Sequence, residues 1–138
     1  MSYIGWVFIA MLTYGIMAVL LKISLRNIPP EVAVLVTNVI LVISALAWAL
    51  FRGIKILNHL TFNQPTLFLL LAGIVLSCSV ISFYMALSRG PVTAVLPIFG
   101  MNVAVASVLG FLVLGEPVNA SRISGIILAG GAVFLLTR

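Results

Sequence analysis

Long apolar stretches along the chain alternate with short polar ones. A helix needs about 20 residues to cross the roughly 30 Å of hydrocarbon in a bilayer. Stretches near that length predict membrane-spanning helices at residues 3–21, 32–51, 66–87, 92–114 and 120–136. Because the connections are short, we expect neighbouring helices to be antiparallel, with no domain outside the membrane. The first stretch is followed by no convincing cleavage site, so we interpret it as a retained helix and not as a signal peptide.

Turn-forming residues occupy the connections. Asn, Gly and Pro gather at residues 27–30, 89–91 and 115–117, and the longest connection covers residues 52–65. Because Pro and Gly favour turns, we expect the helices to end at these points. The only charged residue inside a predicted helix is Arg122, in the first turn of the last one, from where its side chain reaches the interface.

Composition identifies the solvent around these helices. Of the 138 residues 64% are hydrophobic and 7% are charged, and the mean hydropathy is +1.37. A soluble globule of about this length buries only about two thirds of the surface that its unfolded chain exposes. The expected fold is therefore an all-α integral membrane protein with five transmembrane helices, and a soluble enzyme, a disulfide scaffold and a nucleic-acid-binding module are excluded.

Few residues offer catalytic or metal-binding chemistry. The carboxylates Glu31 and Glu116 lie in different connections, and the chain has one histidine, His59, and one cysteine, Cys78. No nucleophile stands beside a base, and no cluster has the spacing of metal ligands. We expect no catalytic residue, no metal and no cofactor.

The basic residues are divided almost evenly between the two sides of the membrane. Five spans place the termini on opposite sides, so one side carries Arg52, Lys55 and Arg122, and the other carries four basic residues: Lys22, Arg26, Arg89 and Arg138. Orientation follows an excess of Lys and Arg on the cytoplasmic side, and here there is hardly any. Two outcomes stay open: insertion in both orientations with an antiparallel homodimer, or one orientation set by local effects. The scattered positive charges suit anionic lipid head groups better than nucleic acid.

Small and polar residues form a row on each of the last two helices. The rows have i, i+4, i+8 spacing and consist of Asn102, Ala106 and Gly110, and of Ser121, Gly125 and Ala129. Small residues at this spacing allow helices to approach closely in lipid. The rows suit packing within one protomer and packing between two protomers equally well.

Ordered motifs across the last three helices resemble a known family. The segments are residues 83–87, 94–97, 114–117 and 124–131, with weaker matches at Trp6, Gly15 and Lys22. Together they resemble one domain of the EamA-like family in the drug/metabolite transporter superfamily, over nearly the whole of residues 1–138. The resemblance implies an exporter of small metabolites or drugs, in which two oppositely oriented five-helix units enclose a central path. One unit is present here, so a second copy or a paralogous five-helix subunit is the expected partner.

Amide side chains stand inside two of the predicted spans, Asn38 in the second and Asn102 in the fourth. An amide without a partner is costly in hydrocarbon, so each must bind a neighbouring helix or a solute. We predict that both line the substrate path, with interhelical hydrogen bonding as the alternative.

Other polar positions extend this predicted path. Tyr14 and Lys22 lie two turns apart on one face of the first helix. Two roles suit Lys22: binding the acidic or polar head of a solute, or reaching the interface. The third helix carries a polar stripe that consists of Ser77, Tyr84 and Ser88. At 100° per residue these side chains fall within about 20° of one another. The alternative is that the serine hydroxyls bond to carbonyls of their own helix.

A proline adds a last position to the path. Pro97 stands five residues into the fourth helix, where a kink beside the path and an ordinary early-helix proline are both consistent with the sequence.

The function expected from these features is export of small organic solutes across the cytoplasmic membrane, by a dimer using alternating access. The first helix lacks the acidic residue that small multidrug resistance proteins use for proton exchange. Without a carboxylate in the membrane, downhill export is favoured over proton antiport. Two other classes stay open: a membrane subunit that transports nothing itself, and a flippase subunit for a lipid-linked group.

Overall fold

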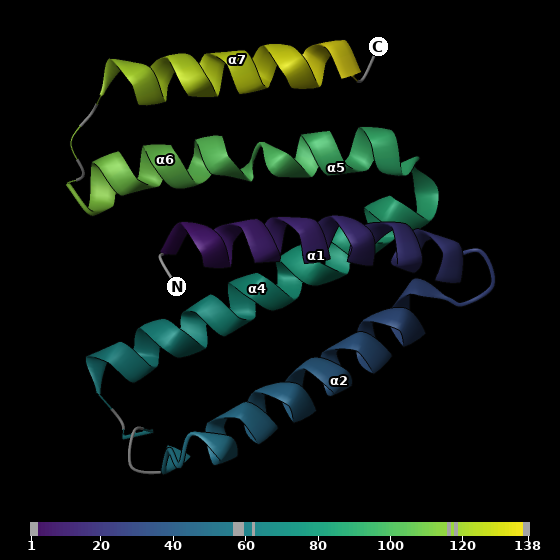
Figure 1. Ribbon diagram of the computed structural model, residues 1–138, viewed down its shortest axis with the longest axis vertical. Coiled ribbons are helices and arrows are strands. Elements are labelled where there is room, and N and C mark those ends of the chain that lie inside the picture. Colours follow the sequence, from purple (N-terminus) through teal and green to yellow (C-terminus); the bar gives the residue numbers. More distant parts are fainter. Residues whose placement is uncertain (1–2, 57–59, 62, 116, 118, 137–138) are drawn as a thin grey trace. The chain divides into compact units, whose positions relative to one another are not determined.

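The computed structural model describes residues 3–56, 60–61, 63–115, 117 and 119–136, and of Arg122 only the backbone. Glu116, His59 and Arg138 lie outside these residues. The helices are shown in Figure 1 and are α1 Tyr3–Ser24, α2 Pro30–Phe51, α4 Gln64–Arg89, α5 Val92–Gly100, α6 Asn102–Val113 and α7 Ala120–Leu136.

The expected all-α membrane fold is confirmed. Within the described residues, four segments are long and apolar enough to cross a membrane: α1, α2, α4, and α5 together with α6. The fifth, α7, is a shorter apolar helix. Most large apolar side chains on these helices are exposed, as lipid-facing surfaces require.

Several helix ends lie beyond the predicted bounds, because turn-forming residues also begin helices. Pro30 is the first residue of α2, where the missing N–H group breaks no hydrogen bond of the helix. Asn63 caps α4: its Oδ1 accepts a 3.1 Å hydrogen bond from the N–H of Thr66. Both α2 and α4 thus gain residues that the sequence analysis assigned to a connection.

The end of α2 shows why glycine follows it. Gly53 has a φ of 66°, which L side chains rarely adopt. Its N–H donates to the Leu50 carbonyl at 2.9 Å, and the N–H of Ile54 donates to the Ala49 carbonyl at 3.1 Å. This pair of bonds is a Schellman motif, which satisfies carbonyls that the helix leaves without partners.

The predicted helix 92–114 is interrupted at Met101. The N–H of Met101 donates to the Ile98 carbonyl at 3.1 Å, and the N–H of Ala104 donates to the Met101 carbonyl at 3.0 Å. Both bonds span three residues and so mark a tighter turn between α5 and α6. Pro97, four residues earlier, lies inside α5, where it has no N–H group to donate to the Thr93 carbonyl.

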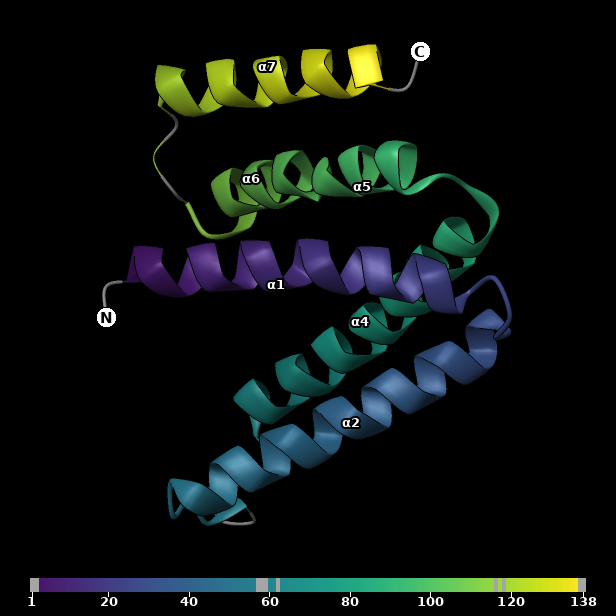
Figure 2. The same ribbon diagram turned by 45° about the vertical axis from the view of Figure 1, so that its right-hand side comes forward.

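The contacts divide the chain into two units. One is Leu20–Ser88, and the other joins Met1–Val19 to Arg89–Arg138; we refer to them as the central unit and the terminal unit. In the central unit α2 and α4 run antiparallel, side by side, and in the terminal unit α7 runs antiparallel beside α5 and α6 (Figures 1 and 2). The antiparallel arrangement expected for these neighbours is therefore confirmed within each unit.

Candidate solute path

Lys22 caps the end of α4 in the central unit. Its Nζ donates to the Leu87 carbonyl at 2.7 Å and lies 3.5 Å from the Ser88 carbonyl. These carbonyls belong to the last turn of α4, where no N–H group of the helix is available to bond to them and where the helix dipole favours a positive charge. The half-buried ammonium of Lys22 thus joins the end of α1 to the end of α4.

The Tyr84 hydroxyl has a partner on α2. Its oxygen lies 2.7 Å from Oγ1 of Thr37, and Oγ1 is 2.9 Å from the Ala33 carbonyl. Because a carbonyl only accepts, Thr37 donates its single hydrogen to Ala33 and Tyr84 donates to Thr37. Tyr84 is 6% exposed, so this bond satisfies a hydroxyl that is buried between the two helices.

The serines of the predicted polar stripe bond to their own helix. Ser77 donates to the Gly73 carbonyl at 2.8 Å, and Ser88 donates to the Met85 carbonyl at 2.8 Å. Such bonds leave the hydroxyl oxygen able to accept but use its hydrogen. The structure therefore divides the stripe: Tyr84 holds α2 and α4 together, whereas Ser77 is exposed.

A groove lies between α2 and α4 and brings two of the predicted path residues together. Its volume is about 620 Å³, and Asn38 from α2 and Ser77 from α4 contribute polar atoms to an otherwise aliphatic lining that begins at Glu31. Asn38 donates from Nδ2 to the Val34 carbonyl at 2.7 Å. Its Oδ1 makes no hydrogen bond with the residues that the structure describes.

The terminal unit holds Tyr14 and Pro97. The ring of Tyr14 stacks on that of Phe99, with the centroids 6.0 Å apart and the planes within 5°. Phe99 lies between Pro97 and the interruption at Met101. The aromatic pair thus links α1 to α5 just before the point where the span is interrupted.

Asn102 begins α6 directly after the interruption and is exposed. Its amide makes no hydrogen bond with any residue in the described part of the chain. It lies at the middle of the 22-residue span Val92–Val113. This position makes it the polar group of the terminal unit that most needs a partner from elsewhere.

The two small-residue rows contain both buried and exposed positions. Gly110 is buried, Ala129 is half-buried, and Ala106, Ser121 and Gly125 are exposed. A Cβ at Gly125 would meet nothing within 4 Å, whereas one at Gly130, next to Ala129, would lie 3.7 Å from Cε of Met101. The start of the α7 row is therefore open, and its later part packs inside the unit.

Comparison with known protein families decides the class of the protein. The chain matches the EamA-like transporter family over residues 1–138. It belongs to this family. Comparisons with curated proteins and with solved structures gave no match. The protein is thus a multi-pass membrane protein of a transporter family, and the expectation that it is not an enzyme is confirmed.

Sequence analysis missed three residues of this EamA-like transporter that the geometry brings forward. Thr37 pairs with Tyr84, Phe99 stacks on Tyr14, and Glu31 lines the groove between α2 and α4. A signal existed for Thr37, because a buried tyrosine hydroxyl requires a partner. Phe99 and Glu31 could be identified only from which helices face each other, and a single sequence does not determine that.

Proposed function

We propose that this EamA-like transporter exports small organic solutes across the cytoplasmic membrane by alternating access, along a path between two five-helix units. Only some of the predicted path residues have polar groups that we assign to the solute. Asn38, Ser77 and Asn102 are the exposed or half-buried polar groups that we assign to the solute. Tyr84 and Lys22 each bond to another helix, and Ser88 bonds to its own. Tyr14 and Pro97 shape the interrupted span beside Asn102.

The single observation behind this proposal is the exposed amide of Asn102 at mid-span. A hydrocarbon environment offers an amide no hydrogen bonds, so a partner must come from a solute or from another part of the assembly. An interrupted span at the middle of the membrane is also where transporters of several folds bind their solutes. Glu31 is the only carboxylate in the described spans, and it lies in the first turn of α2 and not at mid-membrane, so we propose downhill export.

Flux measurements test the path. We expect Asn102→Ala to reduce solute flux about tenfold, as the loss of a hydrogen bond of about 1.5 kcal/mol would. Purified protein in liposomes is assayed with a panel of labelled amino acids and cationic dyes. The matched control is Ser124→Ala, which removes an exposed hydroxyl bonded only to its own helix. Intact flux in Asn102→Ala and Asn38→Ala, at normal expression, would contradict the proposed path.

Pairing with an oppositely oriented copy is the second part of the proposal. The nearly even division of basic residues supports it, because neither orientation is strongly favoured. We expect a C-terminal reporter that is read on both sides of the membrane to give comparable signals from the two sides. A signal from one side only would contradict the antiparallel homodimer and favour a paralogous partner.

A further inference from the structure

The groove between α2 and α4 has the size of a ligand site. Its volume of about 620 Å³ continues into a second hollow of about 380 Å³, which shares Glu31, Val34 and Ile81 with it. Sites for small organic molecules generally measure about 300–1,000 Å³. From Glu31 to Ile43 the lining follows α2 for about 18 Å, at 1.5 Å per residue. The groove thus suits an elongated, mainly apolar molecule.

The polar groups of the groove are mostly acceptors. Asn38 and Ser77 each use a donor on a carbonyl of their own helix, which leaves two oxygens and one amide hydrogen. The third polar group is the Glu31 carboxylate, which only accepts when it is ionised. No basic side chain is among the described residues that line the groove.

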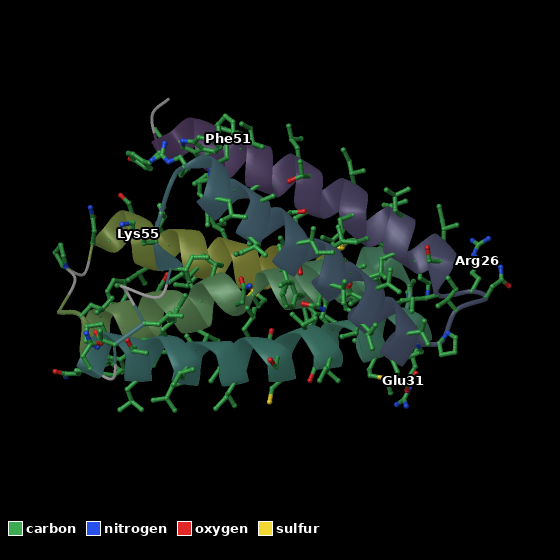
Figure 3. All side chains as sticks on the ribbon, turned by 90° about the horizontal axis from the view of Figure 1, so that it is seen from below. Arg26, Glu31, Phe51 and Lys55 are labelled. Carbon is green, nitrogen blue, oxygen red and sulfur yellow. The ribbon has the colours of Figure 1, made fainter. Side chains whose placement is uncertain are left out.

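Glu31 supplies a negative charge at one end. It lies in the first turn of α2, is exposed, and makes no ion pair within the described residues. Figure 3 shows Glu31 and Arg26 at one end of the central unit, and Phe51 and Lys55 at the other. Arg26 does not line the groove, so a charged group at this end of the groove meets the carboxylate.

We propose that the groove binds an amphipathic organic cation. A protonated amine lies at Glu31 and donates to its carboxylate. The apolar body extends along Val34, Val39 and Ile43 and passes Asn38. Charge-assisted hydrogen bonds are shorter and stronger than neutral ones, so the head group determines the preference. This inference rests on the proposed transport function, since it names the class of solute that the function would handle.

Binding of two matched probes tests the proposal without a flux assay. The probes are dansylated undecyl chains that end in a primary amine or in a carboxylate, and the protein is held in nanodiscs of zwitterionic lipid. Fluorescence from empty nanodiscs is subtracted. We expect the amine probe to bind about tenfold more tightly than the carboxylate probe, and Glu31→Gln to weaken amine binding about tenfold. Glu31→Asp retains the charge and should retain most of the preference.

A second pair of variants locates the site. Ile81 is exposed and lines both hollows, so Ile81→Trp should fill the groove and weaken both probes. Ile74, also exposed on α4 but not part of the lining, provides the control Ile74→Trp. Equal binding of the two probes, unchanged amine binding in Glu31→Gln, or equal effects of the two tryptophans would each overturn the proposal.

The binding and flux results separate the two proposals. Selective amine binding without flux of any solute would leave the groove assignment standing and contradict transport by this protein. Flux that depends on Asn102, combined with no charge preference in the groove, would support the transport proposal and overturn the inferred solute class.

Discussion

Replacing Leu87 with alanine is expected to lower the free energy of unfolding by about 3 kcal/mol. Leu87 is 0% exposed, whereas most large apolar side chains of this protein face outward. Deleting a buried side chain removes its dispersion contacts and leaves a cavity that the surrounding helices fill only partly. The loss should be measured by titration with a denaturing detergent, followed by circular dichroism.

The control for Leu87→Ala is Leu76→Ala on the same helix, because Leu76 is 60% exposed. Its cost should stay within about 0.5 kcal/mol. Equal losses for the two variants would mean that Leu87 is not part of a packed core.

Replacing Lys22 with methionine is expected to cost about 2 kcal/mol, the value of a hydrogen bond made by a charged group. Methionine keeps much of the apolar stem but cannot donate to the Leu87 carbonyl. The last turn of α4 then loses both a donor and a favourable charge. Unfolding in detergent measures the loss, and amide hydrogen exchange at the end of α4 should show where it occurs.

Lys22→Arg is the matched control, since it keeps a positive charge and several donors near the same carbonyls. We expect it to recover more than half of the stability lost in Lys22→Met. If Lys22→Met unfolds like the wild type but reduces solute binding, Lys22 is a solute ligand and the structural role is wrong.

Helices and their order were predictable, because the length and polarity of each stretch are local properties. The apolar runs place α1, α2, α4 and α7 within a few residues of their observed bounds. The interruption at Met101 was not predicted. For Pro97 a kink and an ordinary early-helix proline were both open. The tighter turn forms four residues later, at Met101, where the hydrogen bonds span three residues.

The sequence identified candidate site residues by their side-chain chemistry, but it did not identify their contact partners. A buried tyrosine hydroxyl needs a hydrogen-bond partner, and only the packing of α2 beside α4 identifies Thr37 as the partner of Tyr84. Lys22 had two open roles, and the position of the α4 carboxyl end gives it a third. Glu31 had been considered only as one of two carboxylates too far apart for catalysis, and its place in the groove requires knowing which face of α2 meets α4.

The turn at Met101 has a consequence for how the protein fits its bilayer. It divides one span into rods of 9 and 12 residues, about 14 Å and 18 Å long. A continuous helix meets a thinner bilayer by tilting as a whole. Two rods joined by a tight turn can instead shorten the span by changing their mutual angle. We therefore expect this span to adjust to membrane thickness while its ends keep their depth in the head-group layers.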